Sequence, residues 1–389
     1  MKRILSFGGA LLLVLAFAGT ANAATTWYVN GKSGNDGNDC KSAQTACKSI
    51  GHAIALASSG DTIMVAASTY RENLFIGSGI TLSIIGDAAT TTRIDGGQNN
   101  RVLAIEDASA NITLSNMTIR RGVASGGGGI LNWGTLTISN SIIINNSAAS
   151  SYSSVGGAIF NYLGTLTVNN TTFSSNGGST HQMWGGAIDN EGVATINNST
   201  FSGNYADGAA LGGGGAIWND GTLTINNSTF SGNKATGSGG GAIANESGTT
   251  TISNSTISNN SATGSGGGGI YNTATTILQN SIVADNKTGG NCAGTAMTSN
   301  GYNLSSDSSC NFGSAGDLNS TKPLLGGLTN NGGPTKTRAL LLGSPAIDAG
   351  NPAGCTDGEG NLLTTDQRGY PRPDQDDTGG CDMGAYESD

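Results

Sequence analysis

The sequence carries little positive charge. Its 389 residues include 17 Lys and Arg against 26 Asp and Glu, which gives a net charge of −9. Between Val123 and Gly290 the only cationic side chains are Lys234 and Lys287. DNA, RNA and anionic lipid surfaces bind proteins through clustered Lys and Arg. We therefore expect no nucleic acid among the partners of this protein.

Long apolar runs are also missing, apart from one at the N-terminus. Lys2 and Arg3 precede the apolar stretch 4–17, and the small-x-small sequence Ala-Asn-Ala follows at 21–23. This pattern is typical of a secretory signal peptide, here residues 1–23. A membrane-spanning helix needs about 20 apolar residues, and no later stretch offers them. We expect an exported bacterial-type protein, secreted or at the cell surface, with no membrane span after signal cleavage.

Histidine is scarce, and cysteine occurs in three local pairs. His52 and His181 have no partners at the spacing of a zinc site, and the sequence contains no Cys-x-x-Cys pair. Neither a zinc site nor a Ser-His-Asp site is therefore favoured. An even number of cysteines in an exported chain predicts disulfides. We predict three of them, Cys40–Cys47, Cys292–Cys310 and Cys355–Cys381.

Aromatic residues (5%), charged residues (11%) and proline (6 residues) are sparse, whereas glycine (64 residues), Asn, Ser and Thr are abundant. Such a composition indicates either disorder or a repetitive β structure. Six copies of one unit favour the second. Each copy reads Gly-Gly-Ala-Ile-x-Asn, a short alternating stretch, then Asn-Ser-x-Phe-x-x-Asn, with variations. The Ile of the unit recurs at 130, 159, 188, 217, 243 and 270, and such self-similarity indicates a solenoid.

The units predict strands rather than helices. Stretches such as 222–225, Thr-Leu-Thr-Ile, alternate polar and apolar residues with period two, and no 3.6-residue apolar pattern is present. Equivalent strands of identical coils pair in parallel, about 4.8 Å apart, around a column of Ile, Leu, Val and Phe. We therefore predict an all-β protein built as a parallel β-helix.

Three asparagine positions recur in every unit. At the corner of a stacked coil an Asn amide can bond the same residue in the coils above and below, and Asn tolerates left-handed backbone. We therefore interpret the Asn-x-Ser/Thr matches as structural rather than as glycosylation sites. The first column, which we predict to be a structural ladder, contains Asn132, Asn161, Asn190, Asn219, Asn245 and Asn272. The second contains Asn140, Asn170, Asn198, Asn227, Asn254 and Asn280, and the third Asn146, Asn176, Asn204, Asn233, Asn260 and Asn286.

The double motif resembles a known repeat. Gly-Gly-Ala-Ile at 185–188 followed by Phe-Ser-Gly-Asn at 201–204 is similar to the paired motifs of the polymorphic outer membrane protein repeat. The resemblance covers residues 127–286. It implies a right-handed parallel β-helix and a role in adhesion or surface display.

Both ends of the solenoid differ from the repeats. Residues 24–60 are expected to form an N-terminal cap with a short helix, because Ile50, Ala53, Ile54 and Ala57 mark one apolar face. The β-helix is expected over 61–290. Residues 291–389 are expected to form a loop-rich C-terminal cap. Within it, 329–387 resembles the choice-of-anchor Q domain of exported bacterial surface proteins, on the sequences NNGGPTKTRALLLGSPAIDAG, TDQRGYPRP and CDMGAYE.

Two columns beside the first Asn ladder combine aromatic and acidic residues. The column before it holds Leu131, Phe160, Asp189, Trp218, Ala244 and Tyr271, and the column after it Trp133, Tyr162, Glu191, Asp220, Glu246 and Thr273. Aromatic rings stack on sugar faces and carboxylates accept hydrogen bonds from hydroxyls, so this stripe predicts a carbohydrate site. The candidate ligand-binding residues are Trp133, Phe160, Tyr162, Asp189, Trp218 and Tyr271. Glu191, Asp220 and Glu246 are candidates for catalysis.

Two functions remain open from the sequence. The first is an exported, monomeric β-helix protein that acts in surface display, adhesion or glycan binding without turnover and needs no cofactor. The second is a polysaccharide lyase or glycoside hydrolase on the same scaffold, but the stripe lacks the cation that a lyase would use as proton acceptor. Stacked acids at a turn are also typical of a solvated corner. They could equally hold Ca²⁺.

Overall fold

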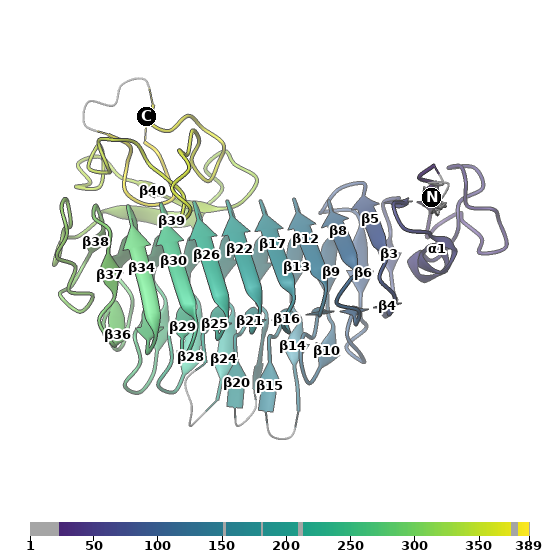
Figure 1. The fold of residues 1–389 in the computed structure, drawn as a ribbon, viewed down its shortest axis with the longest axis horizontal. Coiled ribbons are helices and arrows are strands. Elements are labelled where there is room, and N and C mark those ends of the chain that lie inside the picture. The colour runs from purple at the N-terminus through teal and green to yellow at the C-terminus, as the bar shows by residue number, and fades with distance from the viewer. Residues whose placement is uncertain (1–22, 151–152, 180–181, 209–212, 375–379, 389) are drawn as a thin grey trace, which may run out of the picture.

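The computed structural model describes residues 23–150, 153–179, 182–208, 213–374 and 380–388. The predicted signal peptide lies outside these residues except for Ala23, and His181 lies outside them as well. The chain forms the right-handed parallel β-helix that the repeat predicted, a rod of stacked coils (Figure 1). Within the described residues the structure contains one α-helix, α1 (Ile50–Leu56). It is too short to span a membrane, and no other described segment is helical.

Three long parallel sheets run the length of the rod, counted over the described residues. The eleven-stranded sheet contains β1 (Thr26–Val29), β2 (Thr62–Val65), β5 (Thr81–Gly86), β8 (Asn111–Ser115), β12 (Thr135–Ser139), β17 (Thr165–Asn169), β22 (Val193–Asn197), β26 (Thr222–Asn226), β30 (Thr249–Ser253), β34 (Thr275–Gln279) and β37 (Thr298–Ser299). The ten-stranded sheet contains β3 (Thr69–Tyr70), β6 (Arg93–Asp95), β9 (Thr118–Arg120), β13 (Ile142–Ile144), β18 (Thr172–Ser174), β23 (Thr200–Ser202), β27 (Thr229–Ser231), β31 (Thr256–Ser258), β35 (Ile282–Ala284) and β38 (Leu304–Ser305). The nine-stranded sheet contains β4 (Leu74–Ile76), β7 (Leu103–Ile105), β11 (Ile130–Asn132), β16 (Ile159–Asn161), β21 (Ile188–Asn190), β25 (Ile217–Asn219), β29 (Ile243–Asn245), β33 (Ile270–Asn272) and β36 (Cys292–Gly294).

Shorter strands widen some of the coils. A six-stranded parallel sheet and a two-stranded parallel ribbon extend from the lower edge of the rod in Figure 1. The sheet consists of β10 (Val123–Ala124), β14 (Ser147–Ala148), β19 (Gly177–Ser179), β24 (Tyr205–Asp207), β28 (Lys234–Thr236) and β32 (Ser261–Ala262). The ribbon pairs β15 (Ser153–Val155) with β20 (Gln182–Trp184). These strands lie just before the Gly-Gly turns, where the repeats differ in length.

The period-two pattern explains the core. In β26, Leu223 and Ile225 point inward and are fully buried, whereas Thr222 is exposed. Identical residues stack in register from coil to coil, and the rings of Phe173, Phe201 and Phe230 lie parallel with centroids 4.6 Å apart. Stacked aromatic rings and aliphatic columns remove a large apolar area from water. The solenoid is thus held together by one continuous core.

Glycine is required at the turn that begins each repeat. Gly156 has φ 53°, and a Cβ added there would lie 2.0 Å from the carbonyl oxygen of Ile159. Gly185 repeats this geometry one coil later, with φ 65° and the same 2.0 Å approach to Ile188. A side chain is excluded by both the positive φ and the close backbone. This accounts for the Gly-Gly start of the motif.

Asparagine ladders fasten the coils at two corners. In the first column each Nδ2 donates to the Oδ1 of the Asn in the next coil, at 2.7 Å for Asn132, Asn161 and Asn190, 2.9 Å for Asn219 and 3.1 Å for Asn245. The third column forms a similar ladder from Asn146 to Asn286. All of these amides except that of Asn286 are buried. A buried amide without a partner is costly, so these hydrogen bonds stabilise the stack of coils.

The second column has the left-handed backbone expected of it but does not form a continuous ladder. Its φ angles lie between 46° and 50°. Among the described residues, side-chain hydrogen bonds within the column join Asn170 to Asn140 and Asn280 to Asn254. Asn227 and Asn254 instead donate to the carbonyl oxygens of Thr365 and Thr356. The expected ladder is interrupted because a distant part of the chain binds these amides.

The N-terminal end is closed by α1 and the disulfide Cys40–Cys47. Ile50, Ala53 and both cysteines are buried in the main core. Ser49 caps the helix, and the carboxylate of Glu72 accepts hydrogen bonds from the backbone N–H groups of Ile50 and Gly51. Strand β1 precedes this helix yet pairs with β2 as the first strand of the eleven-stranded sheet. The N-terminal segment therefore contributes to the solenoid as well as covering its end.

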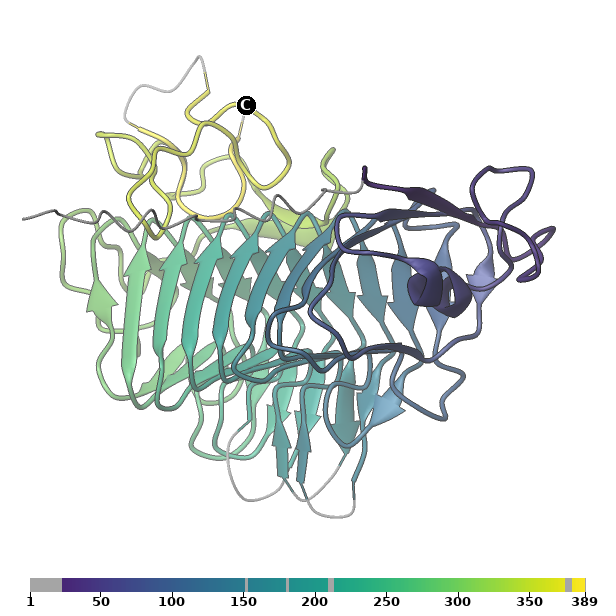
Figure 2. The ribbon, with the colours of Figure 1, turned by 45° about the vertical axis from the view of Figure 1, so that its right-hand side comes forward.

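The C-terminal region, residues 291–389, has one part that closes the last coil and another that lies along the flank of the coils. The last coil is closed by residues 292–312, where the disulfide Cys292–Cys310 and Phe312 join the core. Beyond them, residues 323–374 and 380–388 lie along the flank of the coils, above β26, β30 and β34 in Figure 1, and Figure 2 shows the same arrangement from another side. This part of the chain, called the flanking segment, contains the antiparallel pair β39 (Leu325–Thr329) and β40 (Thr337–Leu340). It binds the flank because the second Asn column presents polar groups there.

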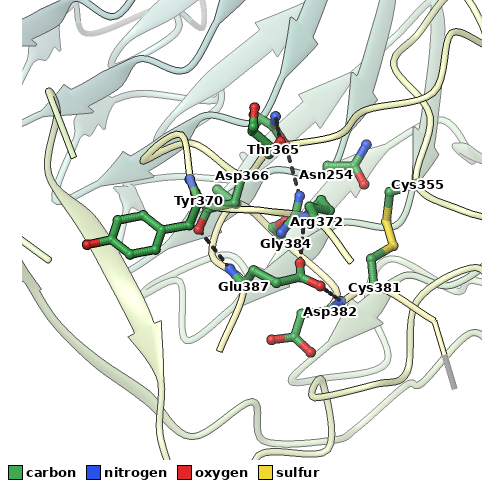
Figure 3. A network of polar contacts seen from close by, with 12 residues as sticks. Asn254, Cys355, Thr365, Asp366, Tyr370, Arg372, Cys381, Asp382, Gly384 and Glu387 are labelled. Atoms are coloured by element: carbon green, nitrogen blue, oxygen red, sulfur yellow. Dashed lines mark hydrogen bonds and ion pairs between the residues drawn. A yellow bond between two sulfur atoms is a disulfide. The ribbon is translucent and has the colours of Figure 1, made fainter. Parts of the chain in front are cut away.

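A buried ion pair fixes the flanking segment, beside the disulfide Cys355–Cys381. The Arg372 guanidinium donates to Glu387 at 2.5 Å and to the side-chain oxygen of Asn227 at 2.9 Å. Figure 3 shows Glu387 between Arg372 and the backbone N–H of Asp382. Both charged side chains are almost completely buried, which is tolerated because each has several hydrogen-bond partners.

Candidate functional site

The stripe of aromatic and acidic residues lies on the outer face of the nine-stranded sheet. Residues before the Asn ladder stack in register, Leu131 on Phe160, Phe160 on Asp189 and Asp189 on Trp218. Their neighbours Ile130, Ile159, Ile188 and Ile217 point into the core, so alternation turns this column outward. Ala244 separates Trp218 from Tyr271, so Tyr271 lies two coils beyond the other members.

An open groove runs over the first half of the stripe. Its volume is about 510 Å³, and its walls come from the nine-stranded sheet and from the ribbon strand β15. Trp133 and Tyr162 are each 40% exposed, with ring centroids 6.0 Å apart, and Phe160 lies 5.5 Å from Tyr162. The groove is lined by Arg101, Ser125, Gly126, Leu131, Trp133, Ser153, Val155, Phe160 and Tyr162. Exposed rings gathered in a groove are typical of a binding site.

Arg101 lines this groove and bonds to the backbone beside it. Its Nη2 donates to the carbonyl oxygen of Gly126 at 2.8 Å, and its Nη1 lies 3.9 Å from Glu106. Burial lowers the pKa of Arg101, and Glu106 opposes that effect. The bond to Gly126 ties the groove floor to the wall formed by the inserted strands.

The second half of the stripe is acidic and centres on Asp189. Its side chain is fully buried between Phe160 and Trp218, and neither carboxylate oxygen has a hydrogen-bond partner among the described residues. Burial raises the pKa of Asp189 well above its ordinary value, and Glu191 and Asp220 raise it further. Burial thus favours the protonated form of Asp189. A buried carboxyl without partners is rare unless it serves a function.

The other acids lie in the column after the ladder. Asp220 is exposed, whereas Glu191 and Glu246 are partly buried. Burial raises the pKa of Glu191, with an added effect of Asp220. Burial also raises the pKa of Glu246, and Asp220 raises it further. The nearby Trp218 indole N–H has the opposite effect on this pKa, although it does not meet the geometry of a hydrogen bond. The three predicted catalytic candidates thus lie in one electrostatically connected cluster with Asp189.

Residues outside the predicted stripe complete the site. Trp184, the last residue of β20, packs on Trp218 with centroids 5.0 Å apart and donates through Nε1 to Ser153. Ser153 and Val155 line the groove from an insertion before a Gly-Gly turn, and Arg101 lines it from an irregular coil before the first clear repeat. The stripe did not reveal them because they lie outside the repeated unit. The extra residues at 150–155 and 179–184 were the one signal available.

The acids do not form a ready metal site. Among the described residues, one group of three His, Cys or carboxylate ligands lies within 4.8 Å, namely Cys40, Cys47 and His52. Its two cysteines are bonded to each other in a disulfide. Glu191, Asp220 and Glu246 therefore do not converge on one point in the way that calcium ligands do.

Comparison with known proteins identifies the repeat and finds several solved structures of limited similarity. Residues 198–220 and 227–246 match the Chlamydia polymorphic membrane protein repeat, which confirms the resemblance there. No curated protein sequence matches the chain significantly. Among solved structures, pectate lyase Pel9A is similar with a TM-score of 0.48 and 15% identity, over 95% of this chain and 97% of that chain. XylC in complex with xylose has a TM-score of 0.40 and 10% identity, over 93% and 98%. The pectin methylesterase from Aspergillus niger has a TM-score of 0.36 and 18% identity, over 76% and 91%.

Proposed function

We propose that this protein is exported and binds a glycan chain in the groove on the nine-stranded sheet, as a surface or secreted β-helix protein. The observation that carries the proposal is the half-exposed ring pair Trp133 and Tyr162, set in a groove of about 510 Å³. Apolar rings pack against the C–H faces of sugars, and the acids further along accept hydrogen bonds from hydroxyl groups. The groove runs across successive coils, which suits an extended chain.

Substitution in the groove tests this proposal. Trp133→Ala and Tyr162→Ala are each expected to weaken binding to the glycans selected by the wild-type protein roughly tenfold, because a stacking surface is lost. The measurement is a glycan array followed by calorimetric titration of the best ligands. Tyr205→Ala is the matched control, since Tyr205 is also 40% exposed but belongs to β24, outside the groove lining. Equal losses for all three variants, or no glycan bound, would refute the proposal.

A second candidate function is glycoside hydrolysis. It is favoured by one observation, the fully buried, unpartnered carboxyl of Asp189 close to the carboxylates of Glu191 and Asp220. Glycosidases use a carboxylic acid of raised pKa together with a second carboxylate. The same titrations, followed for released reducing ends, separate the two functions. Turnover that Asp189→Asn abolishes while binding persists would establish the hydrolase, and binding without turnover would leave a glycan-binding protein.

A further inference from the structure

A second cavity lies beside the groove, at the arginine-rich N-terminal coils. Its volume is about 290 Å³, and its lining includes Arg71, Asn73, Asp95, Asn99 and Arg121. We call this cavity the arginine pocket. It is formed where the turns after β6 and β9 meet the segments that lead into β4 and β7. Its polar lining differs from the aromatic lining of the groove.

The pocket carries an excess of positive charge. Asp95 is 1% exposed, and its carboxylate accepts a hydrogen bond from the backbone N–H of Gly97 at 2.9 Å. The same carboxylate pairs with Arg120 at 2.9 Å and with Arg121 at 3.4 Å. Two guanidinium groups are thus held by one carboxylate. Arg71 forms no side-chain hydrogen bond or ion pair with any residue that the structure describes, so its charge adds to the excess.

The acidic side chains near the arginine pocket bind other groups. The carboxylate of Glu72 binds the first backbone N–H groups of α1, and that of Asp107 binds Ser109. Glu106 faces Arg101. The lining of the pocket, with Arg71 and Arg121 against Asp95, is therefore positively charged in a protein whose net charge is −9. A guanidinium group that has no protein partner is suited to a carboxylate or a sulfate, which it binds with two parallel hydrogen bonds.

The pocket and the groove adjoin each other. Asn99 lines the pocket, and Arg101, two residues later, lines the groove. The side-chain amide of Asn73 donates to the carbonyl oxygen of Arg101 at 2.7 Å, which joins the two linings directly. We propose that the arginine pocket is a subsite for an anionic group, the carboxylate of a uronic acid or a sulfate ester, on the glycan that occupies the groove. This inference rests on the proposed function.

Matched ligands and variants test the subsite. The probes are galactan-type oligosaccharides of equal length that are neutral, uronate-bearing or sulfated, titrated against the full chain. An anionic probe is expected to bind about tenfold more tightly than the neutral one, and Arg71→Ala is expected to remove that preference. Arg121→Gln is the second variant. Arg71→Ala should fold normally because Arg71 has no partner. The control Lys41→Ala/Lys48→Ala removes two exposed positive charges outside the pocket.

The outcomes separate this inference from the proposed function. A preference for the uronate probe, the sulfated probe or both supports the subsite and identifies the anion. If the neutral probe binds equally well and Trp133→Ala weakens it, the groove is a glycan site and the subsite is refuted. If the anion preference falls as much in the lysine control as in Arg71→Ala, the effect is one of general charge and the subsite is again refuted. If no probe binds, the subsite is refuted, and the glycan array decides the proposed function separately.

Discussion

At the scale of single residues, Asp189 is a carboxylic acid buried in apolar surroundings. Phe160 and Trp218 occupy the equivalent places in the adjacent coils, and an apolar residue would fit there as they do. An unpartnered buried polar group costs about 1–3 kcal/mol, and a buried charge costs more. Local destabilisation of this kind is common at functional sites.

Asp189 makes the stability of the protein depend on pH. Its pKa is raised by burial, so the folded chain keeps the proton while the unfolded chain releases it from about pH 4 upward. The free energy of unfolding should therefore fall as pH rises from about 4 to the pKa of the folded state. The fall should be about 1.4 kcal/mol for each unit by which the pKa of Asp189 in the folded state exceeds that in the unfolded state. Asp189→Asn should remove this fall, equalling the wild type near pH 4 and exceeding it at pH 7. Chemical denaturation at both pH values measures this.

The matched control for this experiment is Glu359→Gln, which neutralises an exposed carboxylate in the flanking segment. Its pH profile should follow that of the wild type. If Asp189→Asn behaves in the same way as this control, Asp189 is not held neutral by burial.

At the scale of elements, the flanking segment is held by specific side chains rather than by an apolar face alone. Arg372 and Glu387 are both buried and bond each other, and Arg372 also reaches Asn227 in the second column. Removing one member of a buried ion pair typically costs about 3–5 kcal/mol, whereas replacing both with apolar residues costs much less. Arg372→Met should therefore release the segment, and Arg372→Met/Glu387→Leu should largely restore it. Limited proteolysis of residues 323–388 measures this. Equal protection of the single and double variants would contradict the explanation.

At the scale of the whole molecule, the two terminal regions have different tasks. The N-terminal segment closes the end of the rod, where an open coil would expose strand edges and core residues such as Ile63. The flanking segment covers a side whose backbone groups are already paired between coils. Removal of residues 24–60 should therefore cause aggregation. Removal of residues 323–388 should lower the melting temperature but preserve a β-sheet circular dichroism spectrum. Size-exclusion chromatography and thermal melts distinguish these results, and the reverse pattern would contradict this division of tasks.

The resemblance of residues 329–387 to the choice-of-anchor Q domain remains a prediction. In this chain the motif residues Asp366, Arg368 and Arg372 bond within the flanking segment and to the solenoid. Arg368 lies over the rings of Tyr370 and Tyr386, with its Cζ 4.3 and 3.7 Å from their centroids. These contacts account for the motif through packing and ion pairing.

The sequence by itself determined the scaffold. Period-two alternation, a recurring Ile and recurring Asn positions define which residues face inward, and identical coils can satisfy their backbone groups only by stacking in register. The columns before and after the first ladder followed from that register. Local spacing also predicted the three cysteine pairs that the structure joins as disulfides.

Tertiary structure decided what the register could not. The stripe became a groove because the inserted strands β15 and β20 fold beside the nine-stranded sheet, and repeats do not specify where insertions go. The flanking segment lies along the rod because its Arg372 and Thr365 bond asparagines far away in sequence. Asp189 is buried only because neighbouring coils supply rings around it. Each of these depends on contacts between coils and insertions, whose energies no single repeat contains.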